Sequence, residues 1–242
     1  MARPPSKKKL SPAVPDLDGL ARFRVCQADE TLEDREHSEV VFENCDASNR
    51  SLFDVAFHGV VFRNARFAGT QMRRTTFRDA VVIDSDFSVA DWSGATLQRM
   101  QISGSKLSGL VGVGGRFEDV LFQRCKMHFS LFPTASFRRC RFEECDMVDT
   151  TFEGAKLEDV VFAGCQLRSV NFMDSQLKDV DWRGSEIDGV QIALSQLRGV
   201  TINTSQTAAI AAMTPVTIRD RDSDASGEAP SLSPLVMSSA QR

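Results

Sequence analysis

A period of five residues runs through most of this chain and limits its fold more than any other feature. From Val40 to Ala209 the sequence divides into 34 consecutive blocks of five without an insertion. The third residue of each block, its centre, is Phe, Leu, Ile, Met, Trp or Val in 31 blocks, and the first residue is small or β-branched in 31. These two positions carry one charged residue, Arg50. They therefore predict the protein interior, and the other three positions face solvent.

The fifth position of the block explains how such a chain can turn. It is Gly, Asp or Asn in 22 of the 34 blocks, and these residues tolerate the turn conformations that other side chains resist. A turn every five residues can form one side of a square coil, so that four blocks close a coil of 20 residues. Coils stacked at the strand spacing of about 4.8 Å form a rod. About 8.5 coils then give a length of roughly 40 Å.

Tandem blocks of this kind, such as CRFEE CDMVD TTFEG AKLED VVFAG CQLRS at 140–169, resemble the pentapeptide repeat proteins. The resemblance covers about 70% of the chain. It implies an all-β fold, a right-handed quadrilateral parallel β-helix. Beyond the repeats, the short, apolar and helix-prone segment from Ala208 to Met213, stopped by Pro215, predicts a short C-terminal helical cap. Since each coil satisfies its backbone hydrogen bonds only through its neighbours, stability is close to a nearest-neighbour sum.

Because the register does not slip, residues twenty apart are expected to stack on one of four faces. We name these faces after the residues that begin their first blocks: the Val40 face, the Cys45 face, the Arg50 face and the Val55 face.

One glycine stands at a centre position, where the pattern expects a large side chain. Gly112 neighbours Trp92 among the centres of the Arg50 face, and close packing favours an indole that fills the space the glycine leaves. The alternative is a local bulge in the run Gly109–Gly115. This run lacks the Lys-Ser/Thr ending and the following helix of a phosphate-binding loop.

The residues that could carry chemistry do not form a catalytic or metal-binding pattern. No CxxC occurs, and Cys125, Cys145 and Cys165 are first-position residues twenty apart, so we expect small, buried, apolar filler. Cys45 falls on the same face and Cys140 on the adjacent one. The histidines are too far apart to combine and are expected at the surface: His37, His58 and His128. We expect no enzyme, no metal and no cofactor.

Charge is mixed on every face of the predicted rod. Between residues 40 and 209 there are 21 acidic and 19 basic residues, and no face is strongly acidic. The Val55 face carries a row of basic residues that alternates with acidic ones, and we take it as the candidate interaction face: Arg78, Arg99, Arg116, Arg138, Arg139, Lys156, Lys178 and Arg198. A second basic group lies near the N-terminal end of the rod, where an acidic partner could dock: Arg63, Arg66, Arg73, Arg74 and Arg78.

The ends of the rod are expected to be covered, because an open β-helix end would recruit other chains. We assign 1–14 and 221–242 as disordered tails, 15–39 as an N-terminal cap, 40–209 as the β-helix and 210–220 as a C-terminal cap. The C-terminal cap could also form a two-fold dimer. Its candidate contacts are Ile210, Met213, Val216 and Ile218.

The sequence indicates a non-catalytic β-helical scaffold that binds a protein partner. The net charge of −4 and the pI of about 5.5 give no basic footprint for nucleic acid. No apolar run approaches the length of a membrane span, and no secretory signal is present, so the cytoplasm is the expected location. The resemblance implies an alternative: a DNA mimic that binds a type II topoisomerase, DNA gyrase, and confers fluoroquinolone or self-antibiotic resistance. A duplex mimic needs a coherent negative field, which the mixed faces do not provide.

Overall fold

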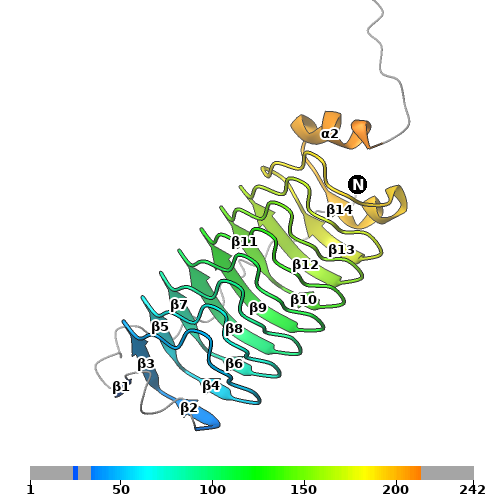
Figure 1. Cartoon of the computed structure of the whole chain (residues 1–242). Helices are drawn as coiled ribbons and strands as arrows, with labels where there is room; N and C mark the ends of the chain where they lie inside the picture. The colour runs from blue at the N-terminus through cyan, green and yellow to red at the C-terminus, as the bar shows by residue number, and fades with distance from the viewer. Residues whose placement is uncertain (1–23, 27–33, 214–242) are drawn as a thin grey trace, which may run out of the picture.

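The computed structural model describes residues 24–26 and 34–213. They form one parallel β-helix of stacked coils, a rod that runs from β3 (Val40–Glu43) near one end to α2 (Thr207–Ala212) at the other (Figure 1). Strand partners are twenty residues apart along the rod, as in Phe42 with Phe62 and Phe62 with Val82. The predicted fold class, a quadrilateral parallel β-helix with a short helical cap, is confirmed.

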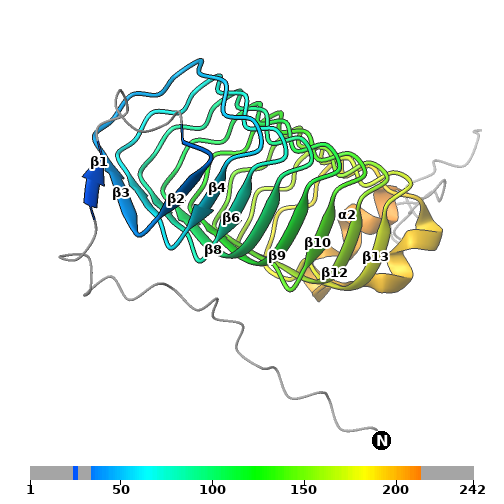
Figure 2. The same cartoon turned by 90° about the horizontal axis from the view of Figure 1, so that it is seen from below.

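Strands lie on two adjacent faces. The Val40 and Val55 faces contain, in chain order, β2 (Glu36–Ser38), β3, β4 (Ala56–His58), β5 (Val61–Arg63), β6 (Thr76–Arg78), β7 (Val81–Ile83), β8 (Thr96–Ser103), β9 (Arg116–Gln123), β10 (Ser136–Arg138), β11 (Arg141–Glu143), β12 (Lys156–Ala163) and β13 (Gln176–Asp181). At one end β1 (Arg24–Cys26) pairs with β3, and at the other β14 (Val200–Thr201) pairs with β13. Figure 2 shows the same strands from below.

The other two faces are held by tight turns and single bridges. On the Cys45 face the N–H of Thr70 donates to the carbonyl of Phe67 at 3.3 Å, and on the Arg50 face the N–H of Thr75 donates to the carbonyl of Met72 at 3.4 Å. These turn hydrogen bonds leave room for one bridge per coil, such as Val111 with Leu131.

Each corner of the coil uses the left-handed backbone region. Every fifth-position residue from Asn44 to Gly189 has a positive φ, between 47° and 80°. Glycine, asparagine and aspartate reach this region at low cost, which is why they dominate these positions. The composition of the fifth position is therefore a direct consequence of the coil geometry.

The core is built from stacked rings. Phe117 stacks on Phe137 with centroids 4.4 Å apart, and Phe142 stacks on Phe162 at 4.8 Å, in both cases nearly parallel. Rings on neighbouring faces meet edge to face, as Phe132 and Phe137 do at 5.5 Å. Both geometries are favoured for aromatic pairs. A small separate cluster, Val41, Val61 and Val81, is buried at outward positions of the Val40 face.

The glycine run at 109–115 follows the regular coil, so it does not form a bulge. Val111 bridges Asp91 and Leu131, and the N–H of Gly114 donates to the carbonyl of Pro133 at 3.1 Å. The packing prediction for Gly112 holds with different partners. A Cβ atom at Gly112 would have ring atoms of Phe132 and Phe117 as its nearest neighbours, not the indole of Trp92.

The N-terminal end begins one block earlier than the predicted boundary at Val40. Strand β2 pairs with β4, and His37 is the centre of this block. The expectation of a surface histidine is wrong for His37, which is 4% exposed and stacks on Phe57 with centroids 5.1 Å apart. Burial lowers the pKa of His37 because desolvation disfavours the imidazolium, against an opposing effect of Asp34.

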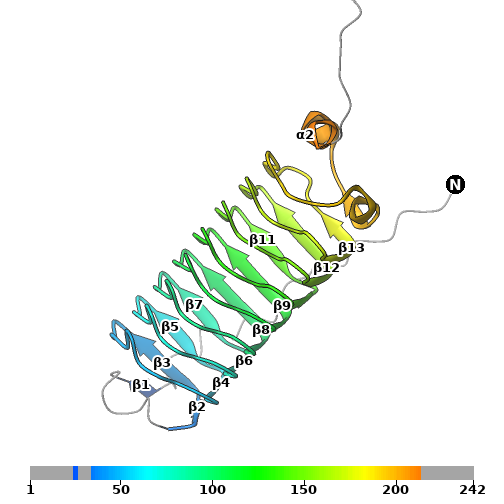
Figure 3. The same cartoon turned by 45° about the vertical axis from the view of Figure 1, so that its right-hand side comes forward.

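The C-terminal end becomes helical before the predicted boundary at 209. The 3₁₀ helix η2 (Leu194–Gly199) begins within the range assigned to the coil, followed by β14, η3 (Thr204–Gln206) and α2. Figure 3 shows α2 at this end of the rod, beyond β13. The physical reason is a pair of glutamines ten residues apart. The amide nitrogen of Gln196 donates to the carbonyls of Phe172 (3.0 Å) and Ser175 (2.6 Å).

Gln206 repeats this arrangement on another side of the rod. Its amide nitrogen donates to the carbonyls of Trp182 and Ser185, both at 2.8 Å, and its amide oxygen accepts from the N–H of Asn203 at 2.9 Å. The two side chains bond to carbonyls that a further coil would otherwise use. Ile210 and Met213 then pack against the end of the core. Val216, Ile218 and the two tails lie outside the described residues.

Candidate interaction surfaces

The predicted basic row on the Val55 face is part of an alternating ladder of charge. Along the fifth position Asp79, Arg99, Asp119 and Arg139 follow one another in successive coils. Arg99 contacts Asp79 at 2.6 Å and Arg139 contacts Asp119 at 2.7 Å. The structure thus brings the predicted basic side chains onto one face and also pairs several of them within that face.

The fourth position of the same face is paired in a similar way. Arg138 contacts Glu118, Lys178 contacts Glu158, and Arg78 donates to the amide oxygen of Gln98 at 3.0 Å. Four members of the predicted set form no ion pair with another described residue: Arg78, Arg116, Lys156 and Arg198.

The pairing fixes the charge of both partners. Hydrogen bonds from Arg99 and Arg139 lower the pKa values of Asp79 and Asp119 below their ordinary range, with desolvation opposing them. Donation from the Arg139 guanidinium to the carboxylates of Asp119 and Glu118 raises the pKa of Arg139. The face therefore presents alternating, internally compensated charge and no field of one sign.

Most of the second predicted basic group is paired as well. Arg63 contacts Glu43 at 3.2 Å, Arg73 contacts Asp91 at 2.5 Å and Arg74 contacts Asp54 at 2.6 Å. Exposed pairs of this kind contribute little to the stability of the fold, because water screens them. Their main consequence here is that the N-terminal end of the rod has no concentrated positive charge.

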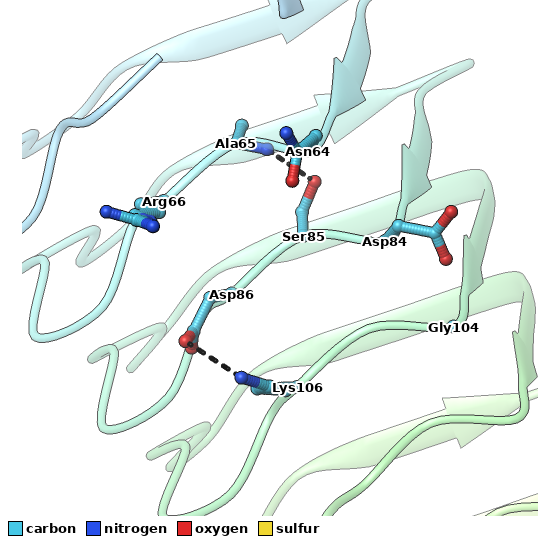
Figure 4. A pocket seen from close by; sticks show the side chains of 8 residues that line it. All are labelled: Asn64, Ala65, Arg66, Asp84, Ser85, Asp86, Gly104 and Lys106. Atoms are coloured by element: carbon cyan, nitrogen blue, oxygen red, sulfur yellow. Dashed lines mark hydrogen bonds and ion pairs between the residues drawn. The ribbon is translucent and has the colours of Figure 1, made fainter. Parts of the chain in front are cut away.

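A polar hollow of about 210 Å³ lies at the corner between the Val40 and Cys45 faces (Figure 4). It opens beside Gly104, where the fifth-position column loses its side chain. The hydroxyl of Ser85 accepts from the N–H of Ala65 at 3.1 Å and donates to the carbonyl of Ile83 at 2.8 Å, while Lys106 lies 4.0 Å from Asp86. Because the Ser85 hydroxyl makes both of these hydrogen bonds to the backbone and none to a side chain that could take its proton, it is not arranged as a nucleophile.

Apolar side chains are gathered on a different face. Seven large apolar residues are exposed among the described residues, and each lies on the Arg50 face or at the corner where the Cys45 face turns into it. We call this set the apolar strip: Phe53, Val89, Val113, Phe129, Leu131, Met173 and Leu194. The most exposed are Val89 (66%) and Phe129 (61%).

The middle of this strip carries no charge. The blocks 110–114 (LVGVG) and 130–134 (SLFPT) contain no ionisable side chain, although the chain as a whole is 26% charged. The flanking charged residues of the face are Asp91 in the preceding coil and Glu153 in the following one. An apolar centre with a polar margin is the usual composition of a protein-binding surface.

Two members of the strip occupy unfavourable backbone conformations. Val89 has φ +57° and Phe129 has φ +56°, the left-handed region in which a β-branched or bulky residue is rare. Glycine, asparagine or aspartate at these positions would fold more easily. Residues held in unfavourable backbone conformations cluster at functional sites, and here two such residues have exposed apolar side chains.

The apolar strip could have been found in the sequence, but a count of the charged residues on each face does not reveal it. Val89, Phe129 and Leu131 stand at the outward positions of their blocks, where polar residues prevail. Counting apolar residues at the three outward positions, one face at a time, would have found the strip.

The cysteines and the remaining histidines add no site. Cys125, Cys140, Cys145 and Cys165 are buried free thiols, and burial raises the pKa of Cys140 to about 12. Within residues 34–213 no group of three His, Cys, Asp or Glu side chains could hold a metal ion. No helix in the described ranges is long and apolar enough to cross a bilayer.

Comparison with known families finds the pentapeptide repeats. The description "Pentapeptide repeat region" matches residues 115–192 and 135–210, and "Pentapeptide repeats (8 copies)" matches 38–79 and 56–91. The Bacillus subtilis (strain 168) protein YisX is 26% identical over 128 residues, which is 53% of this chain and 58% of that protein. The chain thus spans somewhat more than half the length of this relative.

Two solved structures are also similar. A trypsin-treated variant of QnrB1, described as a plasmid-mediated fluoroquinolone resistance protein, is 16% identical with a TM-score of 0.46, over 81% of this chain and 97% of that one. HetL, involved in heterocyst differentiation regulation in the cyanobacterium Nostoc sp. strain PCC 7120, is 15% identical with a TM-score of 0.35, over 70% and 92%.

Proposed function

The chain belongs to the pentapeptide repeat family, and on this premise we propose that it is a non-catalytic scaffold that binds a protein partner along the Arg50 face. One observation carries the proposal. All seven exposed large apolar side chains among the described residues lie on that face or at its corner. Large apolar side chains gathered and exposed on one face are costly in water and mark an interaction site.

The rest of the rod suits this role. A β-helix held by stacked rings and a continuous backbone ladder is rigid, so its outward side chains keep fixed positions. The basic row on the neighbouring Val55 face would form a polar margin that orients a partner without attracting nucleic acid. Within that row Arg116 and Lys156 are the best candidates for contacts with a partner, because they form no ion pair with other described residues.

Site-specific photo-crosslinking in cells tests the proposal. A photoreactive amino acid at Val113, in the middle of the strip, should give a discrete adduct with a protein. The same amino acid at Ala163, on the opposite Val40 face, should give none. Equal labelling from both positions, or no adduct from Val113, would refute the proposed surface.

The alternative function, binding of DNA gyrase as a mimic of duplex DNA, remains a proposal with less support from the geometry. A mimic should present a row of uncompensated negative charge, whereas acidic residues such as Asp79, Asp119 and Glu158 are paired with basic ones. A supercoiling assay with and without ciprofloxacin decides it. Inhibition, or protection from the drug, at micromolar protein would favour gyrase binding over our proposal of a different partner.

A further inference from the structure

We propose that the partner of the apolar strip is a second copy of this chain, packed antiparallel with the two Arg50 faces together. This inference rests on the proposed function, because it names the partner of the same face. The two-fold axis would lie in the plane of the interface, across the rod, between the coils of Val113 and Pro133. Such an axis makes a self-complementary interface.

The geometry of this axis is simple because the repeat is regular. Rotation about it reverses the order of the coils and keeps each residue at the same position within its block. Val113 of one copy then faces Pro133 of the other, and Val111 faces Leu131. All four belong to the uncharged blocks 110–114 and 130–134. The centre of the interface is therefore apolar on both sides.

The same axis places a bulky side chain opposite a glycine at the edge of the interface. Phe129 faces Gly109 of the other copy, since both are fifth-position residues of the Cys45 face in the two central coils. Gly109 presents no side chain of its own, and a Cβ at this glycine would lie 3.5 Å from Cγ2 of Val89. In a symmetric dimer the exposed Phe129 ring would therefore pack over a glycine and beside Val89, twice.

Charge complementarity favours the antiparallel orientation. Towards the N-terminal end the Arg50 face carries three basic and two acidic residues: Arg50, Arg73, Arg74, Asp54 and Asp91. Towards the C-terminal end it carries two acidic residues and no basic one: Glu153 and Asp174. An antiparallel pair joins the unlike ends, whereas a parallel pair would set the two acidic C-terminal ends of the face against each other.

One specific pair follows from this arrangement. Arg74 and Asp174 are both fifth-position residues, in the second and the seventh coil of the face, so they face each other twice across the axis. Asp174 forms no ion pair with any other described residue, and Arg74 has only Asp54, at 2.6 Å. A second copy would supply the missing cation for Asp174. An ion pair at the rim sets orientation more than affinity.

Light scattering of the purified full chain, at concentrations from about 1 to 100 µM, tests the proposal in the range of transient interfaces. We expect the mass to rise from one to two chains. Phe129→Asp should keep the protein monomeric, and Ile210→Asp, at the C-terminal cap, should leave the dimer intact. A monomeric wild type, or a dimer lost only in Ile210→Asp, overturns the inference.

Charge exchange and crosslinking test the orientation. Asp174→Arg should weaken the dimer, and Arg74→Asp combined with Asp174→Arg should restore it. In a Cys26→Ser background, Val113→Cys should form a disulfide-linked dimer. Ser51→Cys, at the end of the same face, should not, because the axis separates its two copies by seven coils. Crosslinking from both positions indicates a parallel pair and contradicts the proposal, even where a charge variant fails to fold.

The two experiments distinguish failure of the dimer from failure of the proposed function. If the purified protein stays monomeric while Val113 captures a different protein in cells, the inference fails and the proposed function stands. If Val113 captures nothing in cells and no dimer forms in vitro, both fail.

Discussion

The ring of Phe132 occupies the space that a side chain at Gly112 would need, since a Cβ atom there would lie 2.7 Å from the ring Cδ1. Both residues are centres of the Arg50 face in successive coils, and both lie at buried positions that face the core. A missing side chain in one coil is thus compensated by a ring in the next.

Gly112→Ala should therefore destabilise the protein by about 1–3 kcal/mol, the usual cost of overpacking a filled core. Urea denaturation measures the change. Phe132→Leu in the same chain is the matched control, because it removes the ring atoms nearest to the new methyl group. The double variant should lose less than the sum of the two single variants. Strict additivity would mean that the two side chains do not compete for this space.

Val89→Asn should stabilise the protein. The left-handed conformation costs an L-residue with a branched side chain about 1–2 kcal/mol, and asparagine tolerates it better. Thermal or urea unfolding should show a gain of about 1 kcal/mol. Val148→Asn, one position before a corner on the same face, should give no such gain, since Val148 has no positive φ. A destabilised Val89→Asn would show that the exposed valine contributes to folding and is not kept for binding.

His37→Phe should raise stability, and raise it more at acid pH. The folded-state pKa of His37 is lowered, chiefly by desolvation, so the unfolded chain binds the proton first as the pH falls. The wild type should lose stability as the pH drops below the ordinary histidine range towards the folded-state pKa.

A phenylalanine at position 37 would extend the column of Phe57 and Phe77 and remove the imidazole Nε2, which has no hydrogen-bond partner among the described residues. Denaturation at pH 7.5 and pH 5 checks the prediction. His58→Phe is the control, because His58 is half-buried at an outward position. Equal pH dependence of wild type and His37→Phe would exclude this role for His37.

Arg139→Gln should reduce stability near neutral pH and have little effect in strong acid. Arg139 holds the pKa of Asp119 below its ordinary value, so this contribution is present above the unfolded-state pKa and is lost as the pH falls through the folded-state pKa. Because the pair is partly exposed, we expect a loss of about 1 kcal/mol or less at pH 7. Arg116→Gln serves as the comparison and should change neither the stability nor its acid dependence.

Gln206→Leu should loosen the C-terminal end of the rod. The variant removes one of the two donors to the carbonyl of Trp182 and the side-chain donor to the carbonyl of Ser185, at a cost of about 1–3 kcal/mol for a buried polar group left unpaired. Hydrogen exchange should rise in residues 180–212 and stay unchanged in the central coils. Thr207→Ala, in the same turn but exposed, should have a smaller effect. Uniform protection along the rod in Gln206→Leu would contradict a capping role.

The five-residue pattern was sufficient to predict the central coils, because the contacts that stabilise them join equivalent positions of the repeat. A centre contacts its counterparts twenty residues away, and the fifth position turns the chain, so the period alone specifies the core, the corners and the register. Phe142, Cys145 and Gly154 lie where their places in the block predict.

The ends, the pairing of charge and the identity of the exposed surface needed the tertiary structure. Gln196 and Gln206 resemble other outward residues of the repeat until the carbonyls that they bind are seen at the end of the last coil. The basic row on the Val55 face looked available in the sequence, but the structure pairs four of its members with Asp or Glu one coil away: Arg99, Arg138, Arg139 and Lys178. Periodicity states which residues share an environment. It does not state where stacking stops or which neighbour a flexible side chain contacts, because those outcomes depend on groups that only the assembled coils bring together.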